Sequence, residues 1–110
     1  MSNDKVLDLE MLKERIAKRE WVKDKELLKL VIDKYKGWTV AHEQAKHGWT
    51  TEDKEILKLT DWKGKTVAHV QAELGWKTED KEILMLADKD GWTVAHEQTR
   101  RGWTTEDKKF

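Results

Sequence analysis

Histidine offers the most obvious chemistry in this chain, because imidazole is a common metal ligand and titrates near neutral pH. His42, His69 and His96 follow one another at intervals of 27 residues, each three residues after a threonine. In neighbouring copies of a helical repeat such side chains lie about 10 Å apart, whereas the ligands of one zinc ion must each approach to about 2 Å. We therefore predict no metal site and no cofactor, and a structural role for these histidines.

No catalytic constellation accompanies the histidines. The chain contains no cysteine, no serine beside a plausible base and no phosphate-binding glycine loop. His42 and Glu43 are adjacent, as are His96 and Glu97, and adjacent residues on a helix do not face each other. We predict that the protein is not an enzyme.

Tryptophans form two groups. One group recurs at a single position of the repeated pattern, which predicts a structural packing ladder of Trp21, Trp49, Trp76 and Trp103. In the other group, Trp38 and Trp92 stand between a glycine and a threonine, where the intervening copy carries Lys65. Because a core position would not readily accept lysine, we expect this site to be exposed.

A row of aromatic and basic side chains on the turn edge is the candidate partner-binding site. Its members are Tyr35, Trp38, Trp62, Lys65, Lys89 and Trp92. Tryptophan and tyrosine are enriched at the energetic centres of protein interfaces. The same row could stack single-stranded bases, but the 22 basic and 22 acidic residues balance, which disfavours nucleic acid. We predict a module that binds another protein and that could inhibit it by covering a functional surface.

The elements that position these side chains are repeats of 27 residues, a period typical of stacked supersecondary units. A chain of 110 residues is one domain. We divide it into an N-terminal capping helix within 1–20, a degenerate repeat at 21–48, repeats at 49–75 and 76–102, and a truncated repeat at 103–110.

Each copy carries two helical stretches. The first begins at a capping threonine and ends at a glycine two turns later; the three caps are Thr39, Thr66 and Thr93. The second is predicted to be capped by Thr51, Thr78 or Thr105, each followed by Glu-Asp, whose carboxylates favour a helix N-terminus. Ile56, Leu57 and Leu59 supply its buried stripe. These patterns predict an all-α fold of short helix-turn-helix repeats.

The glycine, threonine and histidine of each turn resemble the ankyrin repeat signature. The match covers Asp88 to His96, Gly37 to His42 and Gly64 to His69. Valine stands where the family has proline, and the period is 27 rather than about 33 residues. The resemblance implies an ankyrin-like solenoid with a trimmed second helix and a reduced or absent hairpin. It also implies histidines that hold the turns by hydrogen bonds, and a target-binding groove along the aromatic row.

The remaining sequence features concern location and self-association. No apolar run approaches the roughly 18 residues of a membrane span, and no secretory signal stands at the N-terminus, so we expect a cytoplasmic protein without a membrane partner. The last copy starts at Trp103 and stops at Phe110, too short to cover the preceding stripe. A second hypothesis is therefore a structural protein that forms a homodimer through its C-terminal end.

Overall fold

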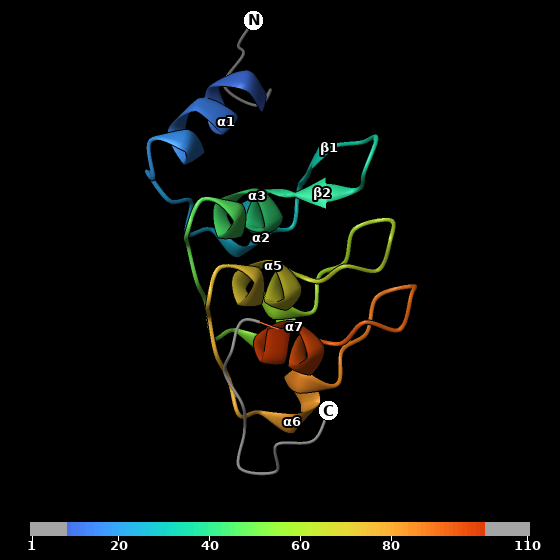
Figure 1. Ribbon diagram of the computed structural model, residues 1–110. Coiled ribbons are helices and arrows are strands. Elements are labelled where there is room, and N and C mark those ends of the chain that lie inside the picture. The colour runs from blue at the N-terminus through green and yellow to red at the C-terminus, as the bar shows by residue number, and fades with distance from the viewer. Residues whose placement is uncertain (1–8, 101–110) are drawn as a thin grey trace, which may run out of the picture.

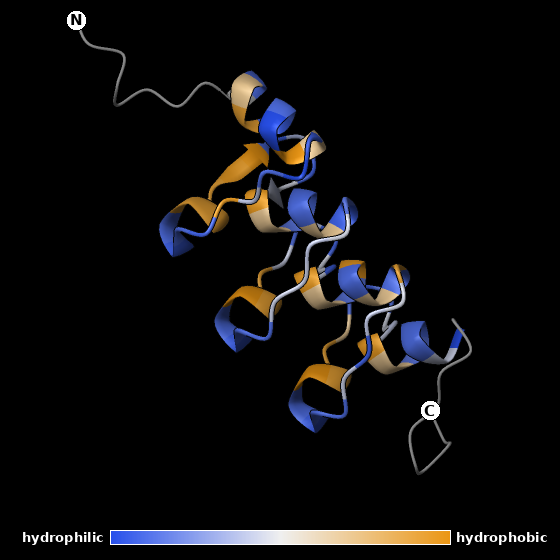
Figure 2. Ribbon diagram, turned by 90° about the vertical axis from the view of Figure 1, so that its left-hand side faces the viewer, coloured by the Kyte–Doolittle hydropathy of each residue, from blue (hydrophilic) through white to orange (hydrophobic). Residues whose placement is uncertain are grey.

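The computed structural model describes residues 9–100 of the chain. This part contains α1 (Leu9–Ala17), α2 (Lys25–Leu28), β1 (Val31–Asp33), β2 (Trp38–Thr39), α3 (Val40–Lys46), α4 (Lys54–Leu57), α5 (Val67–Glu73), α6 (Lys81–Leu84) and α7 (Val94–Arg100). The longer helices α3, α5 and α7 lie in one row, and the short helices α2, α4 and α6 form a second row beside them (Figure 1, Figure 2). Helix α1 lies at the N-terminal end of the rows.

The fold is mixed, so the prediction of an all-α, ankyrin-like solenoid is wrong. Strands β1 and β2 form an antiparallel two-stranded sheet. Its residue pairs are Val31 with Thr39 and Asp33 with Trp38. The turns of the next two units each contain one isolated antiparallel bridge, Thr60 with Thr66 and Ala87 with Thr93. Extended backbone is therefore part of every unit.

The sheet forms where the first unit carries additional residues. Gly37 follows Leu30 by seven residues, whereas Gly64 follows Leu59 by five. The longer connection has room for a second pair of strand residues, and β-branched Val31 suits a strand. The hairpin, which the resemblance implies to be reduced or absent, is present in this unit as strands of three and two residues.

Threonine side chains begin the long helices. Thr39 Oγ1 accepts a hydrogen bond from the backbone N–H of His42, and the His42 ring bonds back to the Thr39 N–H. Thr66 and His69 form the same capping box. At the other end of α3, Gly48 has a φ of 107°, a left-handed conformation that glycine adopts without steric cost. Helices α3 and α5 thus begin and end at the residues that the sequence indicates.

Aspartate, not threonine, begins the short helices. Asp53 Oδ1 accepts from the N–H groups of Glu55 and Ile56, so the predicted cap at Thr51 is wrong by two residues. Thr51 Oγ1 instead accepts from the Asp53 N–H at 3.1 Å. Helix α4 has four residues, far fewer than the roughly 12 that an isolated helix needs in water. The short helices therefore depend on packing against their neighbours.

Apolar side chains between the two rows form the core. A first cluster includes Ile16 from α1, Val40 from α3 and Ile56 from α4. A second cluster includes Leu57 from α4 and Ile83 from α6, together with residues of α5 and α7. Because α4 contributes to both clusters, each unit shares its core with the next.

Buried glutamines tie each long helix to the segment that begins its unit. Gln71 Oε1 accepts from the Thr51 N–H at 2.9 Å, and Gln71 Nε2 donates to the Thr51 carbonyl at 3.4 Å. Gln44 makes the same two bonds with Val22. These amides satisfy backbone groups of a connecting segment that has no regular secondary structure.

Exposed ion pairs repeat along the short helices. Lys54 Nζ lies 2.9 Å from Asp80 Oδ2 and 3.4 Å from Glu82 Oε1, and Lys58 also pairs with Glu82. The same pattern one unit earlier joins Lys25 and Lys29 to Asp53 and Glu55. Water and salt screen such pairs, so they align the units more than they stabilise them.

The turns also pack directly on one another. The Trp62 N–H donates to the Lys36 carbonyl at 2.9 Å, and the Lys89 N–H donates to the Lys63 carbonyl at 2.9 Å. Gly64 has a φ of 80°, and a Cβ added there would lie 3.0 Å from Lys89 N. The absence of a side chain at Gly64 permits this close approach.

Replacing Gly64 by alanine is expected to destabilise the protein more than the same change at Gly91. Both residues have a φ near 80°, so both variants lose about 1–2 kcal/mol to left-handed backbone strain. Only Gly64→Ala also displaces Lys89, because a Cβ at Gly91 meets no described atom within 4 Å. Urea unfolding followed by circular dichroism measures both losses. Equal losses would contradict a stabilising turn-to-turn contact.

Candidate binding groove

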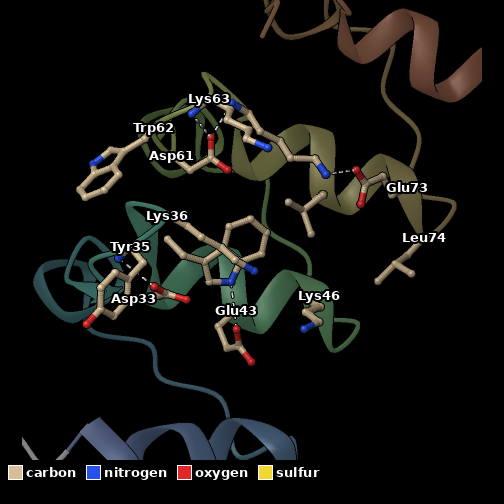
Figure 3. A pocket seen from close by; sticks show the side chains of 13 residues that line it. Asp33, Tyr35, Lys36, Glu43, Lys46, Asp61, Trp62, Lys63, Glu73 and Leu74 are labelled. Atoms are coloured by element: carbon tan, nitrogen blue, oxygen red, sulfur yellow. Dashed lines mark hydrogen bonds and ion pairs between the residues drawn. The ribbon is translucent and has the colours of Figure 1, made fainter. Parts of the chain in front are cut away.

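A groove opens between the first two turns and the helices that follow them (Figure 3). The turns at Gly37 and Gly64 border it on one side, and α3 and α5 form the rest of its wall. Its volume is about 670 Å³. Its lining residues are Asp33, Tyr35, Lys36, Trp38, Glu43, Lys46, Asp61, Trp62, Lys63, Lys65, Val70, Glu73 and Leu74.

Two aromatic side chains stand exposed at the turn side of the groove. Tyr35 is 85% exposed and Trp62 is 58% exposed, and both lie on the same side in Figure 3. The Trp62 indole rests on Gly37, where an added Cβ would lie 2.3 Å from the indole Cδ1. Trp62 is therefore held in place while much of its ring faces water, so binding through it would cost little side-chain entropy.

Trp38 is half-buried and less free than its sequence position predicts. Its ring stacks on His42 with centroids 4.7 Å apart, and its Nε1–H donates to Glu43 Oε1 at 2.9 Å. It also packs against the first core cluster. Trp38 is therefore partly packed against the core and partly exposed in the groove. It offers the groove apolar atoms, because its one polar atom, Nε1, already donates to Glu43.

Lys65 occupies the position of Trp38 one unit later and makes different contacts. Its ammonium group pairs with Glu73. Five residues after Lys65 stands buried Val70, whereas Glu43 stands five residues after Trp38. Where the position holds tryptophan, the residue five positions later is a glutamate that accepts the indole N–H. Where it holds Lys65, that later residue is a valine, which accepts no hydrogen bond.

The third unit places the remaining two predicted residues outside the groove. Trp92 is 38% exposed, stacks on His96 with centroids 4.8 Å apart and donates from Nε1 to Glu97 at 2.8 Å. It lines a second, shallower hollow of about 380 Å³ that includes Lys65. Lys89 lines neither the groove nor this second hollow. The structure therefore brings together Tyr35, Trp38, Trp62 and Lys65, and leaves Lys89 and Trp92 one unit further along.

The carboxylates of the groove are occupied by internal hydrogen bonds. Asp61 Oδ1 accepts from the N–H groups of Lys63 and Lys65, each at 2.9 Å. Asp33 Oδ1 accepts from the Tyr35 N–H at 2.9 Å. Glu43 and Glu73 are engaged by Trp38 and Lys65, as described above. These carboxylates keep their negative charge, and the hydrogen bonds fix their positions in the groove.

Lysines that sequence analysis did not select also line the groove. Lys36 and Lys63 each precede a turn glycine, and Lys46 lies in the last turn of α3. Lys36 and Lys63 are 27 residues apart, so the repeat period was a signal that could have identified them. The same period marks the buried glutamines Gln44, Gln71 and Gln98, which the sequence analysis also missed.

The histidines join successive units. His42 Nδ1 accepts from the Thr39 N–H at 3.2 Å, and Nε2 lies 3.0 Å from the Lys65 carbonyl. Because a carbonyl only accepts, Nε2 carries the proton and the ring is neutral. Burial lowers the pKa of His42 below its ordinary value, the largest cause being desolvation. His69 repeats the link with the Trp92 carbonyl at 2.8 Å.

The other predicted structural residues take similar places. Thr93 and His96 repeat the threonine-histidine bonds at the start of α7. Trp21 and Trp49 are partly buried against the first core cluster, and Trp76 against the second. Trp103, the truncated repeat at 103–110 and the start of the predicted N-terminal helix lie outside the described residues.

Comparison of the chain with known protein families, with curated proteins and with solved structures finds no match. The resemblance to ankyrin repeats therefore stays a prediction. None of the helices within residues 9–100 has the length and apolar character needed to span a membrane. Over the same residues, no group of three or more His, Asp or Glu side chains is arranged to hold a metal ion.

Mild acid is expected to weaken the fold through His42. Its folded-state pKa lies below the ordinary value of 6.5, so below that pH the unfolded chain binds more protons. The stability from the neutral ring is complete above about pH 6.5 and is lost as the pH falls toward the folded-state pKa, by at most about 1.4 kcal/mol per pH unit.

Urea unfolding between about pH 7.5 and pH 5.5 measures this effect, in a window above the titration of ordinary carboxyl groups. His42→Gln is expected to be less stable at neutral pH and to show a shallower pH dependence. His47→Gln is the control, because His47 is only partly buried and bonds to Glu43 within its own helix. A His42→Gln variant with an unchanged slope would contradict the assignment.

Proposed function

We propose that this protein is a non-enzymatic module that binds another protein through the groove. The observation that carries the proposal is the exposed aromatic pair Tyr35 and Trp62 beside the half-buried Trp38. Exposed aromatic side chains that are already held in position are typical centres of protein interfaces. Binding would remove them from water without first having to order Trp62.

The size of the groove favours a short segment of the partner. A volume of about 670 Å³ falls in the range of about 300–1,000 Å³ that is usual for sites that enclose a small ligand. A few residues of an extended or helical segment fit such a space, with further contacts along the exposed turns. Covering a functional segment of the partner would inhibit it.

The chemistry of the groove supports binding rather than catalysis. His42 uses both ring nitrogens in structural bonds, and Asp61 and Glu43 accept internal hydrogen bonds. The chain contains no cysteine, and the groove contains no serine. We place this binding module in the cytoplasm as part of the same proposal.

The double variant Tyr35→Ala/Trp62→Ala tests the site. Peptides are first selected on the native protein from a random display library, and their affinities are then measured by isothermal titration calorimetry. We expect the double variant to bind at least about tenfold more weakly, since each aromatic residue at an interface centre contributes more than about 1 kcal/mol. Both residues are exposed, so the variant is expected to keep its helical circular dichroism spectrum.

Met85→Ala is the matched control, because Met85 is 74% exposed and does not line the groove. It is expected to bind the selected peptides like the native protein. Unchanged affinity in a folded Tyr35→Ala/Trp62→Ala variant would show that the peptides bind elsewhere, and the proposed site would be wrong.

A further inference from the structure

The charges of the groove are balanced in number but not in availability. The groove is lined by four acidic and four basic side chains. All four carboxylates accept internal hydrogen bonds or pair with a lysine. Of the four lysines, only Lys65 has an acidic partner. Lys36, Lys46 and Lys63 make no ion pair or side-chain hydrogen bond within residues 9–100.

We infer that the groove recognises an acidic peptide segment that also carries an apolar side chain. The inference rests on the proposed function and names the chemistry of the partner. The three unpaired ammonium groups would meet carboxylates of the ligand. Trp38, with its indole N–H already bonded to Glu43, offers the ligand an apolar surface only.

The lysines lie at two ends of the groove, which favours an elongated ligand. Lys36 and Lys63 belong to the turns, whereas Lys46 lies at the C-terminal end of α3. In Figure 3 Lys46 and Leu74 lie on the side opposite Tyr35 and Trp62. Leu74 is 58% exposed and extends the apolar surface at that end. A segment with acidic residues toward both ends and an apolar residue between them matches this arrangement.

Fixed carboxylates make the groove less suitable for nucleic acid. A nucleic-acid strand carries a charge at every nucleotide, so some phosphates would approach Asp33, Asp61 or Glu43 wherever the strand lay. A peptide can place its acidic residues opposite the lysines alone. The basic side chains are all lysines, which bind as point charges and do not provide the bidentate geometry with which arginine recognises phosphate.

Three short peptides of equal length provide the test. Each is an end-blocked peptide of about six residues that fills a site of this size, with leucines in the middle and glutamate, glutamine or lysine at both ends. Binding is followed on the full chain through the indole N–H signals in two-dimensional NMR spectra. We expect the glutamate peptide to bind at least about fivefold more tightly than the glutamine peptide at low salt, and this preference to shrink as salt screens the charges.

Lys36→Gln/Lys63→Gln is the variant that tests where the charge preference arises. Neither side chain supports the fold by a hydrogen bond, so the variant is expected to stay folded and to lose most of the preference for glutamate. Lys77→Gln/Lys81→Gln is the matched control. It changes the net charge equally at two exposed lysines outside the groove, and it is expected to retain the preference.

The outcomes separate this inference from the proposed function. Equal binding of the glutamate and glutamine peptides, abolished by Tyr35→Ala/Trp62→Ala, would leave a peptide-binding groove but overturn the acidic partner. Tighter binding of a single-stranded oligothymidine than of the glutamate peptide would overturn both. Absence of binding by all three peptides at millimolar concentration would also overturn the inference.

Discussion

A neutral imidazole that spans two units is the interaction on which the arrangement depends. The His42 ring receives a hydrogen bond from Thr39 in its own unit and gives one to the Lys65 carbonyl in the next. One nitrogen accepts and the other donates, so the two bonds exist together only in the uncharged ring with its proton on Nε2. The ring thereby sets the start of α3 and the position of the following turn together. His69 carries the same constraint one unit further.

The groove results from the fixed position of each turn relative to the next. Each turn is held against the next by a backbone hydrogen bond, such as the one from Trp62 to Lys36, and by the small volume of the turn glycine. Exposed side chains at the tips of the turns therefore form a row whose geometry is set by buried groups. The hydrogen bonds that shape the turns also use the carboxylates of Asp33 and Asp61. The groove therefore combines carboxylates in fixed positions with three lysines that have no acidic partner within residues 9–100.

The repeat period revealed the positions that recur, and local chemistry revealed how the long helices begin and end. The first hairpin was missed because its strands are two and three residues long, too short to show the alternating pattern by which a strand is recognised in a sequence. Both Thr51 and Asp53 are good helix caps, so the choice between them was not evident locally. The backbone of Thr51 is held by Gln71, 20 residues away, and the helix begins after it.

The character of the groove was predicted only in part. Tyr35 and Trp62 were selected by type and spacing, and both are exposed. Trp38 was expected to be exposed because Lys65 takes its place in the next unit. That argument assumed that the two positions have the same neighbours. The residue five positions later also changes, from Glu43 after Trp38 to Val70 after Lys65. Whether a lysine is free to meet a ligand depends on the ion pairs it makes in the folded chain, such as the pair between Lys65 and Glu73 of the following helix, and composition does not reveal these pairs.

The atom that receives the histidine proton belongs to the main chain, and this has a consequence for how the protein can diversify. Lys65 and Trp92 both serve as acceptors through their carbonyl oxygens, although one side chain is cationic and the other aromatic. The hydrogen bond between units therefore does not depend on which amino acid provides the carbonyl. Mutation can alter what this position displays without disturbing that hydrogen bond, so new specificities are accessible from one inherited framework.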